Sequence, residues 1–214
     1  MEQNSQEARQ LTQSIFSTVR AFVEQQQYFF EMLWRKAIPA KQRIKEIEEG
    51  LKREFIETIQ DPAEIHSLVL KVISSATEEI DIVFSTPNSF KRYQKEGIID
   101  MLTIRTNEDN LRVRILVNHN YEIQETLGIF TKRNPQITIR NLEKSVQTKV
   151  NTIVADNELS LVIELKDDSK QDSNKAMGLA TYSNSESTVT SYASIFEILW
   201  TSARPHSFND NTNP

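Results

Sequence analysis

The sequence predicts an α/β fold: a mixed, mostly parallel sheet flanked by helices, preceded by a long N-terminal helical hairpin and followed by an amphipathic exit helix. Two observations support this prediction. Between residues 61 and 203, short runs rich in β-branched residues alternate with segments of helical periodicity, an order typical of parallel sheets covered by helices on both faces. At 30–39 and 196–205, near the two ends of the chain, one ten-residue pattern occurs twice.

The repeated pattern reads Phe-Glu-apolar-Leu-Trp-x-x-Ala-x-Pro, and it contains the only two tryptophans, Trp34 and Trp200. In each copy the apolar positions fall at helical spacing and a proline ends the run, so each copy predicts an amphipathic helix with a defined stop. A repeat of this kind indicates a module with a similar exit helix on each side. Two unrelated helices rich in Leu and Trp are the alternative.

Residues 1–60 are predicted to form a helical signalling or dimerisation region. Apolar residues from Leu11 to Leu33 recur at spacings of three, four and seven. This spacing predicts one long helix over residues 5–36 with a seam toward another helix. Pro39 ends this helix, and opposite charges four residues apart predict a second, solvent-exposed helix over about 41–60.

Residues 61–203 are predicted to form an αβ sensor-like domain, and residues 204–214 a disordered tail. Pro62 suits the first turn of a helix, and Asp156-Asn157-Glu158 reads as a turn between two strands. The expected helices lie at 65–76, 93–106, 122–132 and 186–203, and the expected strands at 80–84, 111–117, 137–139, 150–155, 159–165 and 177–182.

The composition excludes several classes of protein. The chain has no cysteine, which rules out disulfides, thiolate metal sites and cysteine catalysis. Its formal net charge of −5 argues against general nucleic-acid binding, which needs a basic face. No apolar run approaches the roughly 18–20 residues of a membrane-spanning helix, and no signal peptide opens the sequence. We therefore expect a cytoplasmic protein with no membrane insertion and no nucleic-acid partner.

Several segments carry a family resemblance. The strongest lies between Leu159 and Trp200 and reads SLVIELKDDS, then AMGLATYSNSESTVTSYASIFEILW; EQQQYFFEMLWRKAIPAKQRIKEIEEG and SSATEEIDIVFSTPNSFKRYQKEGIIDML precede it. These segments resemble the region before the dimerisation helices of archaeal two-component sensor histidine kinases, and the resemblance extends from about Phe22 to Ala203. It implies a sensor or linker role, with a homodimer, or a heterodimer with related kinases, as the expected assembly.

No kinase core is recognisable in the sequence. No helix carries a phosphoacceptor histidine in an acidic context, and four glycines are too few for the nucleotide pocket of a kinase. We therefore expect a non-catalytic sensory module of two-component signal transduction, in which a small-molecule ligand or a partner bound to the αβ core acts on helices across a dimer. No cofactor is expected. A stand-alone interaction domain that pairs with full-length kinases is an open alternative.

The αβ region also resembles a degenerate half of the phospholipase D fold, as found in sugar-sensing archaeal transcription regulators. The active pattern of that family is His-x-Lys, four residues, then Asp. The best register here is Lys149-x-Asn151, four residues, Asp156, which keeps only the aspartate. The family's chemistry needs a histidine nucleophile and a second histidine as proton donor, so the resemblance implies the fold without the activity. A phosphodiesterase with an altered motif is the remaining enzymatic alternative.

Polar residues follow three of the predicted strands, and we take them as candidate ligand-binding residues. Ligands of open α/β sheets bind beyond the carboxyl ends of parallel strands, so these side chains are predicted to line a pocket for a small metabolite, nucleotide or anion. Helix capping explains the same residue types equally well, and Asp156 also suits a turn. The candidates are Ser85, Thr86, Asn88, Asn118, His119, Asp156, Ser183 and Asn184.

No catalytic residue and no metal site is predicted. The three histidines, His66, His119 and His206, lie far apart in the sequence without carboxylates at ligand spacing. No glycine-rich phosphate loop or nucleophile elbow is present.

Overall fold

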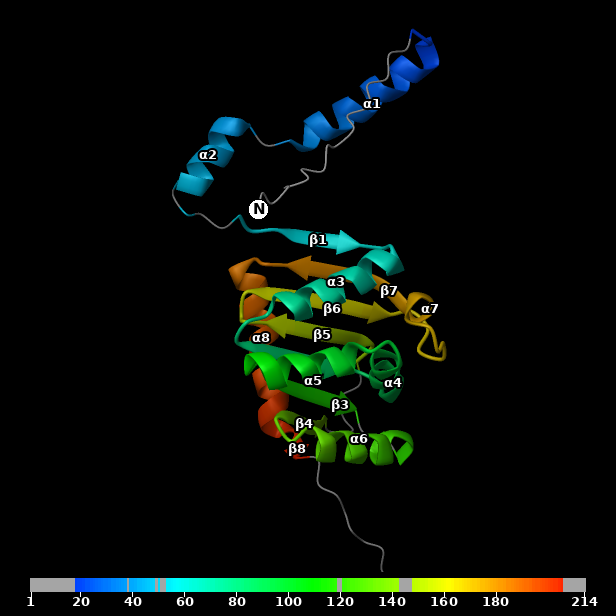
Figure 1. Ribbon diagram of the computed structural model, residues 1–214, viewed down its shortest axis with the longest axis vertical. Helices are drawn as coiled ribbons and strands as arrows, with labels where there is room; N and C mark the ends of the chain where they lie inside the picture. Colours follow the sequence, from blue (N-terminus) through cyan, green and yellow to red (C-terminus); the bar gives the residue numbers. More distant parts are fainter. Residues whose placement is uncertain are drawn as a thin grey trace, which may run out of the picture. The chain divides into compact units, whose positions relative to one another are not determined.

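The computed structural model describes residues 18–37, 39–48, 50, 53–118, 121–142 and 148–205 (Figure 1). The chain divides into two compact units, Met1–Arg53 and Glu54–Pro214. The first unit contains α1 (Arg20–Lys36) and α2 (Ala40–Glu48). The predicted helix over 5–36 is thus described from Arg20 onward. Its first residues and most of the predicted tail, 206–214, lie outside the described residues.

In the described part of the second unit, eight strands form one sheet in the order β1-β7-β6-β5-β2-β3-β4-β8 (Figure 1). The central strand β2 is buried along its whole length, as expected for a strand covered on both faces. The strands are β1 (Ile56–Ile59), β2 (Glu79–Phe84), β3 (Arg112–Asn118), β4 (Ile137–Leu142), β5 (Val150–Ala155), β6 (Leu159–Leu165), β7 (Met177–Ser183) and β8 (Arg204–Pro205).

The sheet is mostly antiparallel, so the prediction of a mostly parallel sheet was wrong. Strand β3 runs parallel to β2 and β4, whereas β1, β5, β6, β7 and β8 all join the sheet through antiparallel pairs. Parallel neighbours need a crossover of a dozen or more residues, usually a helix. Between β4 and β7 each connection is shorter than this, as at Asp156–Glu158 between β5 and β6, so successive strands from β5 to β7 reverse direction.

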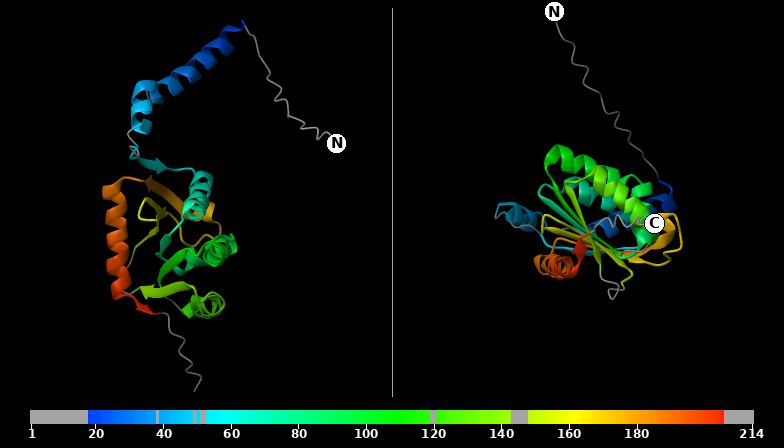
Figure 2. Two further views of the ribbon diagram at one scale, coloured as in Figure 1. Left: turned by 60° about the vertical axis from the view of Figure 1, so that its left-hand side comes forward. Right: turned by 90° about the horizontal axis from the view of Figure 1, so that it is seen from below.

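The helices form unequal layers on the two faces of the sheet (Figure 2). The larger core packs between one face and the helices α3 to α6, while α8 packs on the opposite face over a smaller core. The short helix α7 precedes β7. The helices are α3 (Pro62–Ser75), α4 (Pro87–Lys95), α5 (Ile98–Asp109), α6 (Tyr121–Arg133), α7 (Ser173–Ala176) and α8 (Glu186–Ser202).

Two helix predictions differ from the structure. The expected helix over 93–106 is two helices, because the chain turns at Gly97 with φ 76°, a left-handed conformation that glycine adopts readily. The expected helix over 41–60 ends at Glu48, and Ile56–Ile59 is instead the edge strand β1, which pairs with β7. Only Ile59 of β1 is buried, so β1 lacks the alternation of buried apolar and exposed polar residues that marks a strand in a sequence.

Helix α8 is held on the sheet by an arginine. Arg114 of β3 donates to both carboxylate oxygens of Asp81, at 2.7 and 2.6 Å, and to Glu197 of α8 at 2.6 Å. Its guanidinium also lies 4.9 Å from the ring centre of Phe196, within the range of a cation–π contact. Arg114 therefore links β2, β3 and α8 through charge and packing together.

Burial and pairing act in opposite directions on this cluster. Burial raises the pKa of Asp81, although the hydrogen bond and the charge of Arg114 lower it in part. Burial lowers the pKa of Arg114, but its hydrogen bonds to Asp81 and Glu197 outweigh this effect and leave that pKa raised. The cluster is therefore costly to desolvate, and each charged group depends on its partner.

We expect Arg114→Leu to lower the free energy of unfolding by about 3–5 kcal/mol, because it leaves Asp81, which is 4% exposed, without its partner. Denaturant unfolding measures the loss. Arg112→Leu on the same strand is the matched control: the Arg112 side chain is 65% exposed, and its partner Glu79 keeps the amide of Asn157 as a donor, so the loss should be well below that of Arg114→Leu. The double variant Arg114→Leu/Asp81→Leu should recover much of the loss. A double variant as unstable as Arg114→Leu alone would contradict this account.

Candidate functional site

Three of the candidate residues lie together where β2 ends. The N–H and the hydroxyl of Ser85 both donate to Oδ1 of Asn151, at 3.0 Å each. Thr86 caps α4 by accepting from the N–H of Ser89, and its hydroxyl donates to Asp168 at 2.8 Å. The amide of Asn88 donates to the backbone carbonyl and the carboxylate of Asp168. All three residues hydrogen-bond within the protein, and only Thr86 does so as the helix cap that its residue type suggested.

A buried arginine completes this cluster. Arg92 of α4 is 3% exposed, and it donates to the carboxylate of Asp168 at 2.7 Å and to the hydroxyl of Ser89 at 3.1 Å. It also donates to the backbone carbonyls of Asp168 and Lys170. Arg92 therefore fastens the loop after β6 onto the first turns of α4, and its guanidinium is occupied by these partners.

The register of the phospholipase D pattern falls on β5 and the residues that flank it. Lys149, at the position of the catalytic histidine, is exposed just before the strand. Asn151, at the position of the catalytic lysine, is buried and holds Ser85. The two positions therefore present an exposed ammonium and a buried amide where the active pattern has an imidazole and an ammonium.

Asp156 has a structural environment at the far end of β5. With Asn157 it forms the turn into β6, and both residues have positive φ, 52° and 51°, as in the tight turns of β-hairpins. Its carboxylate accepts from the backbone N–H groups of Thr77, Glu78 and Glu79, at 2.8, 2.8 and 2.9 Å. Asp156 thus fixes the chain where it enters β2.

The candidates fall at two opposite ends of the sheet. Asn118 ends β3 beside Ser85, because β2 and β3 run parallel. Strand β7 ends at Ser183 at the other end of the sheet. There the Ser183 hydroxyl donates to the backbone carbonyl of Phe55 at 2.8 Å, and Asn184 accepts from the N–H of Phe55 at 2.7 Å. His119 lies outside the described residues. The structure therefore brings together the residues after β2 and β3, and separates them from Asp156, Ser183 and Asn184.

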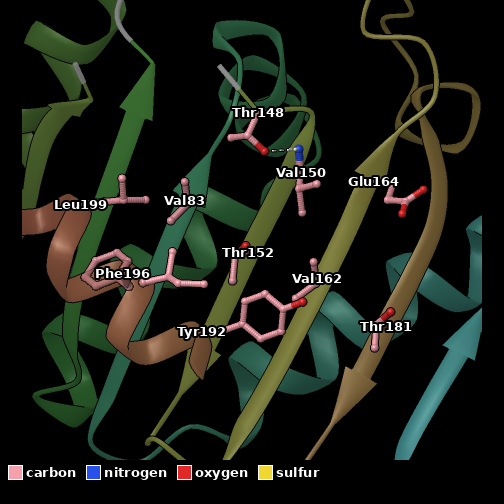
Figure 3. A pocket seen from close by; sticks show the side chains of 11 residues that line it. Val83, Thr148, Val150, Thr152, Val162, Glu164, Thr181, Tyr192, Phe196 and Leu199 are labelled. Atoms are coloured by element: carbon pink, nitrogen blue, oxygen red, sulfur yellow. Dashed lines mark hydrogen bonds between the residues drawn. The ribbon is translucent and has the colours of Figure 1, made fainter. Parts of the chain in front are cut away.

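A groove of about 470 Å³ lies on the α8 face of the sheet (Figure 3). Strands β2, β5, β6 and β7 form its floor, and α8 forms a wall along one side. Its surface is mostly apolar, with a few hydroxyl groups and one carboxylate. The lining residues are Val83, Thr148, Val150, Thr152, Val162, Glu164, Thr181, Tyr192, Ile195, Phe196 and Leu199.

Sequence reasoning missed both the groove and the Arg92–Asp168 pair. The pair joins residues 76 positions apart, and no local pattern reports such a contact. The groove had a sequence signal in α8, where Ile195 adds an apolar residue to the face that carries the buried Phe196 and Trp200; Ile195 is 49% exposed and lines the groove. An amphipathic helix needs one apolar face for its own core, so an apolar residue that widens that face points to a second contact surface.

Two further observations limit the kind of site. Within the described residues, no three histidine, aspartate or glutamate side chains are grouped as metal ligands. The helices of the same residues include none that combines the length and the hydropathy needed to cross a membrane.

No protein-family model and no curated protein matches this chain, but solved structures do. The phospholipase D family member Nuc from Salmonella typhimurium superposes with a TM-score of 0.54 and 16% identity, over 72% of this chain and 98% of that one. NucT from Helicobacter pylori gives 0.54 and 14%, over 72% and 99%. TrmBL2, an archaeal chromatin protein with a novel mode of DNA binding, gives 0.51 and 14%, over 87% and 69%.

The αβ unit therefore has a phospholipase D-like fold. The match to TrmBL2 covers more of this chain than the matches to Nuc and NucT do. Its 87% of 214 residues is about 186 residues, more than the 161 residues from Glu54 to Pro214. The likeness to the chromatin protein thus includes part of the N-terminal helical unit as well as the sheet.

We expect Asp156→Ala to lower the free energy of unfolding by about 2–3 kcal/mol, because three backbone N–H groups lose their acceptor and alanine is strained at positive φ. Denaturant unfolding measures this loss. Asp156→Gly controls for the backbone strain, because glycine adopts positive φ readily but supplies no acceptor, and Asp156→Asn should lose less because it keeps one acceptor oxygen. Stability of Asp156→Gly equal to that of the wild type would refute the structural role.

Proposed function

We propose that this chain is a non-catalytic regulatory module with a phospholipase D-like fold. In this proposal the αβ unit binds a small ligand or a partner protein, and binding acts on the terminal helices across a dimer. The observation that carries the proposal is which residues occupy two positions of the phospholipase D pattern, one just before β5 and one on it. Lys149 stands where the histidine nucleophile is needed, and Asn151 has its amide oxygen engaged by Ser85.

The chemistry of the phospholipase D pattern supports this proposal. An imidazole attacks the phosphorus because its nitrogen is unprotonated near neutral pH, whereas a lysine ammonium is protonated there and has no free electron pair. Turnover also needs a second imidazole to protonate the leaving group. In the described residues the one histidine is His66, which lies on α3 beside Glu96, at 3.7 Å. The motif register therefore lacks both the nucleophile and the proton donor.

The regulatory part of the proposal rests on other observations. The sequence resembles the input region of archaeal sensor histidine kinases, and the chain carries two matching helices, α1 before the αβ unit and α8 near the C-terminal end of that unit. The groove beside α8 offers a mostly apolar surface on which a partner segment can pack. A two-component kinase input module, cytoplasmic and dimeric, is the specific form that we propose. A stand-alone domain that pairs with related kinases differs from it only in needing no ligand, and co-purification with such a kinase would favour it.

The purified protein should not hydrolyse a generic phosphodiester such as bis(p-nitrophenyl) phosphate. The assay compares the wild type with Asp156→Asn at high enzyme concentration, with a histidine-bearing phospholipase D enzyme as positive control. We expect both proteins to match the rate of the buffer, because neither motif position supplies a nucleophile. Turnover by the wild type that Lys149→Ala abolishes would overturn the proposal and support the phosphodiesterase alternative.

DNA binding is a second candidate, favoured by the likeness to TrmBL2 beyond the αβ unit. The expectation of no nucleic-acid partner came from the net charge of −5 alone, and a local basic surface can bind DNA despite it. Fluorescence anisotropy with labelled duplex DNA tests this at about 50 mM salt, where phosphate contacts are strongest. If the negative net charge prevents DNA binding, the anisotropy should not change at micromolar protein concentrations. Saturable binding that weakens steeply toward 200 mM salt would establish DNA as a partner.

A further inference from the structure

The repeated sequence pattern corresponds to two copies of the same helix. Helix α1 covers Arg20–Lys36 and α8 covers Glu186–Ser202, so both have 17 residues and both ends are offset by 166 positions (186 minus 20, and 202 minus 36). Each is followed by an alanine in nearly the same conformation, Ala37 with φ −72° and ψ 142° and Ala203 with φ −71° and ψ 142°. The repeat is therefore structural as well as sequential.

The aromatic residues of the two helices have the same geometry and opposite environments. Phe30 and Trp34 stack with ring centres 5.7 Å apart, and Phe196 and Trp200 stack at 5.5 Å. In α8 this pair is buried against the sheet, with 1% and 9% exposed. In α1 the pair is 60% and 70% exposed. In the described structure the Phe30–Trp34 face of α1 is exposed, whereas the equivalent Phe196–Trp200 face of α8 packs on the sheet.

The α8 face of the sheet has room for a second helix. Figure 2 shows several helices on one face and α8 on the other, and Figure 3 shows the groove running beside α8. Neighbouring helices pack about 8–10 Å apart, so a helix laid along α8 would lie over the groove floor. That floor carries the β-branched residues Val150, Thr152, Val162 and Thr181, which form the pleated surface that large aromatic residues pack against.

We propose that the groove beside α8 receives α1 of a second copy of this chain. Each copy then gives one helix and receives one, which is the reciprocal exchange that closes a symmetric dimer. A second copy fits because α1 repeats the apolar positions with which α8 already covers this sheet: Val23 matches Val189, and Leu33 matches Leu199. The inference rests on the dimer of the proposed function and names its interface.

Cross-linking tests the interface, because the chain has no native cysteine. Leu33→Cys and Thr181→Cys are prepared as separate proteins with different tags, mixed, and treated with a short bismaleimide. We expect a product with twice the 24.7 kDa mass of one chain that carries both tags. Tyr28→Cys replaces Leu33→Cys as the matched control, since it lies five residues away and about 140° round the helix, and it should give at least a tenfold lower yield.

Three outcomes would overturn the inference. The first is that the mixed product does not form. The second is that Thr181→Cys cross-links to Ile198→Cys of α8 in the other copy and not to Leu33→Cys. The third is that a chain carrying both Leu33→Cys and Thr181→Cys cross-links only within itself. Sedimentation of Thr181→Lys gives independent evidence, with an expected rise of at least tenfold in the dimer dissociation constant. Its thermal unfolding is compared with the wild type to establish that it folds. If the dimer persists unchanged in this variant, the interface is wrong while the regulatory proposal stands.

Discussion

The guanidinium of Arg114 is the interaction on which the arrangement of the αβ unit depends. It rises from β3, holds the buried Asp81 of β2, reaches Glu197 of α8, and lies against the ring of Phe196. A buried ion pair adds little net stability over an apolar replacement, but its hydrogen bonds restrict how the elements that carry the two charges can be positioned. Arg114 therefore fixes the C-terminal half of α8 over β2 to β4, where Val83, Leu116 and Leu142 pack beneath it. Because α8 crosses the sheet in this position, it forms the wall of the groove that lies beside it on the same face.

Local pattern was sufficient for the central strands and failed where direction or edge position mattered. The strands over 150–155 and 159–165 were predicted with the bounds that the structure has, because β-branched runs and a turn at Asp156 mark them. Alternation of strands and helices suggested parallel pairing, but periodicity carries no information on strand direction. The edge strand β1 was read as helix because the charged residues before and within it continue a helical spacing and only Ile59 is buried.

The error in strand direction also explains the outcome at the candidate site. Ser183 and Asn184 were placed with Ser85 on the premise that the last strand ends at the same edge as the parallel strands. Strand β7 runs antiparallel to β6, β6 to β5, and β5 to β2. Strand β7 is therefore antiparallel to β2, and its C-terminal end lies at the opposite edge of the sheet. Residues close in sequence to one strand end, such as Thr86 and Asn88, were correctly grouped. Arg92 was beyond reach, because its partner Asp168 comes from a loop that only the folded sheet brings to α4.

The physical roles of the three motif positions explain why the aspartate is the one that matches the active pattern. Asp156 supplies acceptors to three consecutive N–H groups at the entry to β2, so replacing it disturbs the central strand whatever the protein does. A histidine at 149 or a lysine at 151 serves the reaction, and the fold places no comparable demand on them. Asn151 even gains a structural use, since a neutral amide oxygen can accept from both groups of Ser85 in a buried site where an ammonium could accept from neither. The fold therefore needs Asp156 at the turn into β6, whereas Asn151 at the second motif position serves the packing of the residues after β2.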